Sequence, residues 1–124
     1  MNMDEFKELF IEEAKKSITE IENNLILLKE NYDENVMLNL KRQFHTLKGN
    51  SASMGYDNFF ELSKSLNDLS CQVIDKKLEF NLELLTLFDS AKNVLLDALD
   101  EIKNDNLTNF NDNGLTKKIQ NMLY

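Results

Sequence analysis

Apolar side chains recur at three- and four-residue steps through most of the chain, which is the pattern of helices with one buried face. The first stripe, within residues 4–29, consists of Phe6, Phe10, Ala14, Ile18, Ile21, Leu25 and Leu28. The second consists of Val36, Leu40, Phe44, Leu47, Ser51 and Met54. A polar break at residues 30–33 separates the two, and Asp33 or Asn35 can cap the second helix by accepting a backbone N–H.

Two further stripes follow with the same spacing. The third consists of Phe59, Leu62, Leu66, Leu69 and Val73, and the fourth of Leu84 or Leu85, Phe88, Ala91, Leu95, Ala98 and Ile102. Asp57 and Asn81 are the predicted caps of these helices, and Gly55 suits the left-handed position just past the second helix. Because only residues 55–57 separate the second helix from the third, the two are predicted to be antiparallel neighbours.

The four stripes predict an all-α fold, an antiparallel up-down-up-down four-helix bundle over about residues 3–103. The Asn- and Asp-rich segment 104–114 is typical of a loop, and residues 115–123 are predicted to form a short fifth helix. A chain of 124 residues with no Pro and three Gly fits one helical domain, so we expect a single domain over residues 1–124.

The charge of the chain limits its partners. Acidic residues outnumber basic ones 22 to 14, giving a net charge of −8, which argues against general binding of nucleic acid. Residues 35–56 are an exception, because they contain Lys41, Arg42 and Lys48 and no carboxylate. The single cysteine, Cys71, has no internal disulfide partner, and no signal peptide or membrane span is visible, so we expect a cytoplasmic location and no membrane insertion.

The only histidine, His45, lies in the stretch FHTLKGNSASMGY. Lys41 and Lys48, at positions i−4 and i+3, share its helix face, as do the small residues Gly49 and Ala52. A neutral imidazole is a good nucleophile near neutral pH, and a lysine can neutralise phosphoryl oxygens. Glycine inside a helix costs about 1 kcal/mol relative to alanine, so close approach of another protein is a reason for it here.

Other uses of a lone histidine lack their remaining parts. One His and one Cys do not make a zinc or di-iron site, and no metal site is predicted. The chain has no nucleophile elbow and no glycine-rich nucleotide loop. Any phosphoryl group must therefore come from another protein or from a domain outside these residues.

The pattern H-x-L-K-G-x-S-x-x-x-G around His45 closely resembles the phospho-accepting helix of histidine phosphotransfer (HPt) domains. The start FIEEAKKSITEIENNLILL and the variant FHTLKG…MGY are similar to the N-terminal phosphotransfer (P1) domain of chemotaxis kinases of the CheA type. The resemblance covers about residues 3–103. It implies that His45 accepts the phosphoryl group, that Lys48 stabilises it, and that Gly49 leaves room for the partner.

Two positions depart from the kinase-linked members of this family. Those members have a Glu on the next helix that hydrogen-bonds the imidazole, and a second His one turn before it; the matching residues here are Asn67 and Lys64. The Asn67 carbonyl can still hold the Nδ1–H tautomer but lacks the charge that raises imidazole basicity. With Lys41, Arg42 and Ala52, the neighbouring Phe60 is predicted to dock a receiver domain.

The resemblance implies a carrier that passes the phosphoryl group of His45 to an aspartate of a response-regulator receiver domain. Mg²⁺ is expected in the receiver, and ATP only through the ATP-binding domain of a partner histidine kinase. Two alternatives stay open. The residues could be the substrate domain of a CheA-type kinase, with kinase activity belonging to the larger chain, or a helical adaptor that docks receivers without carrying phosphate.

Overall fold

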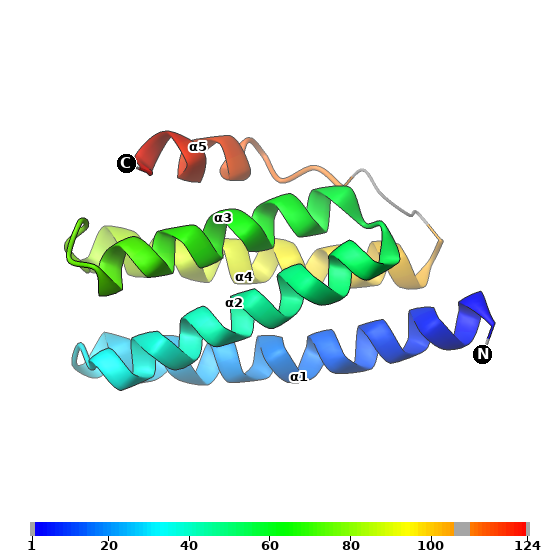
Figure 1. Ribbon diagram of the computed structural model, residues 1–124, viewed down its shortest axis with the longest axis horizontal. Coiled ribbons are helices and arrows are strands. Elements are labelled where there is room, and N and C mark those ends of the chain that lie inside the picture. Colours follow the sequence, from blue (N-terminus) through cyan, green and yellow to red (C-terminus); the bar gives the residue numbers. More distant parts are fainter. Residues whose placement is uncertain (1, 106–109, 124) are drawn as a thin grey trace.

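The computed structural model describes residues 2–105 and 110–123, and Figure 1 shows their helices. The helices are α1 (Met3–Glu30), α2 (Glu34–Met54), α3 (Asp57–Ile74), α4 (Leu82–Lys103) and α5 (Leu115–Met122). The first four run in alternating directions, with α2 in contact with both α1 and α3, and α4 in contact with α1 and α3 (Figure 1). The predicted all-α four-helix bundle with a short fifth helix is confirmed.

Capping side chains define where several helices begin. At the start of α1, Asn2 accepts from the backbone of Glu5 at 2.9 Å, while the Glu5 carboxylate accepts from the Asn2 N–H at 3.2 Å. The predicted caps Asp33 and Asn81 accept from backbone N–H groups at 3.1 and 2.9 Å. The prediction for α3 is wrong, because Asp57 lies inside its first turn and the cap position holds Tyr56 without a side-chain cap.

Aromatic contacts in the core fix how α2 is rotated. Phe44 of α2 stacks on Phe88 of α4 with ring centroids 5.8 Å apart, and both side chains are fully buried. Since one residue along a helix turns the direction by about 100°, the residue after Phe44 must point away from the core. That residue is His45, and it is exposed.

The first stripe contains one error. Phe6 is 43% exposed, whereas the other members of the stripe are buried. The first turns of α1 extend past the turn that joins α2 to α3, so no neighbouring helix covers them fully (Figure 1). Helical periodicity identifies the inward face of a helix but not the length over which another helix packs on it.

The fifth helix packs on the side of α3 and buries Ile119 completely. Gly55 and Gly114, which end α2 and begin α5, have φ angles of 73° and 76° in the left-handed region that glycine tolerates. Of the predicted loop 104–114, residues 106–109 lie outside the described residues. In the part of the chain that the structure describes, no helix is long and apolar enough to cross a membrane.

Candidate functional site

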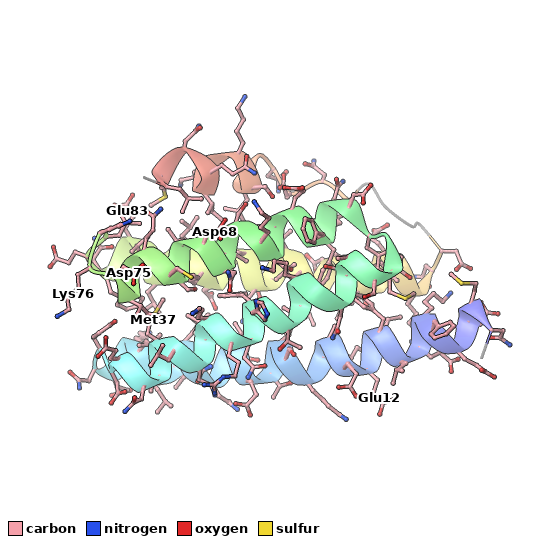
Figure 2. All side chains as sticks on the ribbon, in the orientation of Figure 1. Glu12, Met37, Asp68, Asp75, Lys76 and Glu83 are labelled. Carbon is pink, nitrogen blue, oxygen red and sulfur yellow. The ribbon has the colours of Figure 1, made fainter. Side chains whose placement is uncertain are left out.

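The turn between α2 and α3 determines which residues of the two helices lie at the same height. His45 is ten residues before Gly55, and Asn67 is ten residues after Asp57. Because a helix rises by about 1.5 Å per residue, both lie about 15 Å from the turn. α2 and α3 lie side by side on the viewer's side of the bundle in Figure 2, and their contact is the most extensive between any two described helices.

The same register pairs the other predicted site residues. Lys48 is level with Lys64, seven residues from either side of the turn, and Ala52 is level with Phe60. Ala52 and Lys64 are exposed, and Lys48 and Phe60 are half-buried. The register therefore places the predicted residues at matching heights on two packed helices, and we call this set the α2–α3 face. It consists of Lys41, His45, Lys48, Gly49, Ala52, Phe60, Lys64 and Asn67.

Gly49 is not required by the packing of the bundle. A Cβ built on it meets no atom within 4 Å, and its backbone is that of an ordinary helix. An alanine would thus fit and would favour the helix by up to about 1 kcal/mol. The packing of the described residues therefore does not account for a glycine one turn after His45.

The cations around His45 are uncompensated. Lys41, Arg42 and Lys48 make no ion pair with any residue in the described ranges. Lys41 is half-buried, whereas Arg42 is exposed and about 60° around the helix from His45, so it borders the α2–α3 face. Unpaired cations beside an exposed imidazole provide a site with affinity for an anion.

Asn67 is buried at the height of His45 and has an unused acceptor. It is 7% exposed, and its Oδ1 accepts no hydrogen bond. A buried polar atom left without a partner typically costs about 1–3 kcal/mol. The described structure contains no hydrogen bond from His45 to this oxygen, so the arrangement has an acceptor in reserve beside the imidazole.

The sequence did not identify Ser63, which lies one turn before Asn67 on α3. Its hydroxyl is fully buried and also has no partner, unlike Ser51, Ser65 and Ser70, which donate to backbone carbonyls four residues earlier. Within the described residues, these two side chains contain the only buried side-chain nitrogen or oxygen atoms without a hydrogen-bond partner. The sequence shows that Ser63 lies four residues before Asn67 and so on the same side of the helix, but it does not show that the Ser63 hydroxyl is buried.

Lys64 is only loosely engaged on its own helix. Its Nζ lies 3.9 Å from Asp68 Oδ2, and the two side chains are 51% and 42% exposed. Figure 2 labels Asp68 on α3, one turn further along the helix. Such an exposed i,i+4 pair contributes little to stability, about 0.3–0.5 kcal/mol, so Lys64 remains available to other anions.

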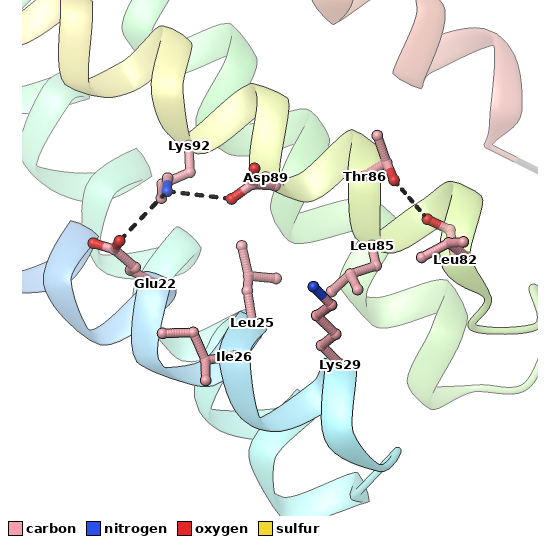
Figure 3. A pocket seen from close by; sticks show the side chains of 9 residues that line it. All are labelled: Glu22, Leu25, Ile26, Lys29, Leu82, Leu85, Thr86, Asp89 and Lys92. Carbon is pink, nitrogen blue, oxygen red and sulfur yellow. Dashed lines mark hydrogen bonds and ion pairs between the residues drawn. The ribbon is translucent and has the colours of Figure 1, made fainter.

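A second polar site lies between α1 and α4 and has the opposite character. Lys92 is 8% exposed, and its Nζ lies 3.2 Å from Asp89 and 3.9 Å from Glu22 (Figure 3). It borders a groove of about 310 Å³ whose other walls are largely aliphatic, including Leu25, Ile26, Leu82 and Leu85. Two carboxylates neutralise this lysine, and the described residues contain no cluster of three His, Cys, Asp or Glu side chains suited to a metal ion.

The chain is similar in sequence to several chemotaxis proteins. The chain is 32% identical over 83 residues to the chemotaxis protein CheA of Halobacterium salinarum, a match that covers 66% of this chain and 12% of that protein. It is 29% identical over 104 residues to CheA of Bacillus subtilis, covering 83% of this chain and 14% of that protein. The chain thus spans a small part of the length of these relatives.

The fold is shared with a solved structure, the phosphorylated P1 domain of CheA3 in complex with CheY6 from R. sphaeroides. The TM-score is 0.88, and the match covers 97% of this chain and 96% of that one at 22% identity. At this identity the likeness concerns the fold. Residues 5–105 match the Hpt domain model, which includes the whole α2–α3 face and leaves α5 outside. The chain therefore belongs to the Hpt domain family.

Proposed function

We propose that this chain is a phosphotransfer module that carries a phosphoryl group on His45 and passes it to an aspartate of a receiver domain. The observation that carries the proposal is the exposed His45 of an Hpt-family bundle, flanked by the unpaired Lys48 and the open backbone of Gly49. We also propose that it works in the cytoplasm. The positive α2–α3 face is a local exception in a chain whose net charge is −8.

The chemistry requires a free Nε2 and a proton on Nδ1. In the transfer step a carboxylate oxygen of the receiver attacks phosphorus, the P–O bond forms and the P–Nε2 bond breaks. The imidazole then leaves as a neutral ring that retains its Nδ1 proton. Asn67 Oδ1, buried and without a partner, supports this role because it can accept from Nδ1–H and hold that tautomer.

The flanking residues act on the charge and on access. Lys48 neutralises the phosphoryl oxygens on the ring, since it makes no ion pair with any described residue. Gly49 lets the backbone of the partner approach the phosphorus. Lys41 and Arg42 attract an acidic receiver pocket, and the small Ala52 beside the apolar Phe60 gives the partner a surface to pack on.

The partners supply the groups that this chain lacks. The receiver supplies the aspartate and the Mg²⁺, and ATP acts only through the ATP-binding domain of a histidine kinase. A protein of the same fold is recorded as a phosphorylated P1 domain in complex with CheY6, which supports a receiver as the partner here. This chain itself is a carrier rather than a complete enzyme.

A second candidate function is the substrate domain of a CheA-type kinase. The relatives favour it, because they are chemotaxis CheA proteins of which the match covers 12–16%. Asn67 and Lys64 count against it, since they replace the Glu and His of kinase-linked members. Sequencing the reading frame past Tyr124 for ATP-binding motifs separates the two, and both predict phosphorylation of His45.

The test uses the purified chain with kinases and receivers of the same cell, labelled ATP and Mg²⁺. The parent should acquire acid-labile, base-stable phosphate and lose it when a receiver is added, whereas His45→Gln should acquire none at an unchanged melting temperature. The proposal is rejected if His45→Gln becomes labelled. It is also rejected if the parent stays unlabelled with every kinase and every phosphorylated receiver that is tested. An adaptor that only docks receivers predicts the same receiver dephosphorylation with the parent and with His45→Gln.

A further inference from the structure

Lys64 and its neighbour Asp68 have no part in the transfer chemistry described above. Among the described residues, Lys64 is the only cation of the α2–α3 face that pairs with a carboxylate, and the contact is long and exposed, with 3.9 Å between Nζ and Oδ2. Lys64 is also level with Lys48, so two amines stand at one height on the two helices beside His45. The positive charge that α3 offers to a group on His45 therefore depends on whether Lys64 is paired with Asp68.

We propose that Lys64 exchanges its carboxylate partner for the phosphoryl group of His45, so that the Lys64–Asp68 pair sets how firmly the phosphoryl group is retained. The inference rests on the proposed function and deepens it. A phosphoryl group carries nearly two negative charges and three strong acceptor oxygens, whereas the Asp68 carboxylate carries one charge. An amine held loosely by the weaker anion will favour the stronger one when both are within reach.

The dimensions of the helix pair permit this exchange. Packed helices have axes about 8–10 Å apart, and Lys64 is three residues, or about 4.5 Å along the axis, from the height of His45. The flexible four-carbon stem of a lysine spans this separation toward a group that projects from the neighbouring helix. Because the ion pair with Asp68 holds the amine along α3 in the direction of Asn67, Lys64 starts on the side that faces the His45 level.

The exchange gives the two residues opposite effects. Lys64 stabilises the phosphorylated form, and Asp68 opposes it by competing for the same amine. Asn67 adds no charge, so the lysines of the α2–α3 face are Lys41 and Lys48 on α2 and Lys64 on α3, and Asp68 borders the face as the partner of Lys64. Such a site favours holding the phosphoryl group over releasing it, which suits a carrier with a long-lived intermediate.

The experiment compares phosphorylated parent, Lys64→Gln, Asp68→Asn and the double variant. The readouts are the equilibrium of transfer to one receiver and the ³¹P-detected pKa of the phosphoryl group on the ring. Lys64→Gln should shift transfer toward the receiver by about twofold to fivefold and raise the phosphoryl pKa, and Asp68→Asn should do the reverse. Lys117→Gln and Asp97→Asn, at exposed positions of α5 and α4, remove the same charges at a distance as controls.

The double variant decides how Asp68 acts. If Asp68 works by occupying Lys64, the double variant should match Lys64→Gln alone, a departure from additivity that a double-mutant cycle measures. The inference is overturned if Lys64→Gln and Lys117→Gln shift the transfer equilibrium equally, or if Lys64→Gln and Asp68→Asn shift it in the same direction. In either case the proposed function still stands as long as His45 is labelled. If the parent carries no phosphate on His45, the proposed function itself fails.

Discussion

Two lysine environments on this bundle differ in what surrounds the charge. Between α1 and α4, the amine of Lys92 is nearly buried and lies within 4 Å of two carboxylates, Glu22 and Asp89 (Figure 3). On the α2–α3 face, Lys41 and Lys48 are half-buried and have no carboxylate partner among the described residues. The first arrangement satisfies its own charge, and the second leaves charge for something outside the chain.

The contrast extends to uncharged polar groups. Asn24 Nδ2 of α1 donates a hydrogen bond of 2.8 Å to Asn39 Oδ1 of α2. Asn67 and Ser63, on the other side of α2, are buried without partners. Folding alone disfavours unsatisfied polar atoms, so these two, on the helix that packs against that of His45, stand apart from the satisfied pair. We therefore expect mutations on the α2–α3 face to change phosphotransfer more than stability, and mutations between α1 and α4 to change stability more than phosphotransfer.

The largest effect is expected from removing one lysine charge at each of the two regions. Lys48→Gln should slow phosphotransfer roughly tenfold, about 1.4 kcal/mol, because the proposed phosphoryl group on His45 loses a cation one turn away on the same helix. Its melting temperature should not change. Lys92→Gln should leave transfer intact but lower stability by about 1 kcal/mol, since it loses two ion pairs and a packed aliphatic stem. Transfer kinetics and thermal unfolding of both variants measure this crossed pattern, and a transfer defect in Lys92→Gln would break the comparison.

Gly49→Ala should move stability and transfer in opposite directions. The added Cβ has free space, so helix propensity should stabilise the fold by about 0.5–1 kcal/mol. The same methyl group occupies the surface that the receiver approaches, and transfer should slow severalfold. Denaturant unfolding and transfer rates test this, with Ala52→Gly as the matched variant that opens the face and weakens the helix. Unchanged transfer in Gly49→Ala would remove the docking explanation for this glycine.

Asn67 offers a smaller but more diagnostic change. Asn67→Leu removes a buried unsatisfied carbonyl and should leave stability equal or higher by about 1 kcal/mol, while phosphorylation slows because the Nδ1–H loses its acceptor. Asn67→Glu should instead raise the phosphorylation rate, since a carboxylate increases imidazole basicity. Initial rates with one kinase measure both. Equal rates for the two variants would mean that Asn67 does not act on the imidazole.

Much of the fold was predictable because its determinants are local. The stripes gave the helices, Asp33 and Asn81 gave two of the caps, and the short turn at Gly55 gave the antiparallel pairing that brings His45 and Asn67 to one height. Exposure of Phe6 was not predictable, because it depends on where α1 outruns its neighbours. The unpartnered state of Asn67 and Ser63 likewise depends on long-range packing, which spacing along one helix does not determine.

The smallest effect concerns α5, which lies on the opposite side of α3 from α2 and outside the family match. Burial alone would raise the pKa of Asp112, but hydrogen bonds from the Thr116 hydroxyl and from the backbone N–H groups of Thr116 and Gly114 outweigh it and lower the pKa. A carboxyl whose pKa is lowered on folding stabilises the fold above its unfolded value of 3.8, and that contribution is lost as the pH falls through the lower folded value.

Asp112→Ala should therefore cost about 1 kcal/mol at pH 7, as loss of a helix cap does, and the difference from the parent should shrink toward zero as the pH falls below about 4. Thermal unfolding of both proteins between pH 7 and pH 3 measures it. Phosphotransfer should not change, because α5 packs on α3 away from His45. A transfer defect in Asp112→Ala would mean that α5 supports the α2–α3 face through α3, and the site would then extend beyond residues 5–105.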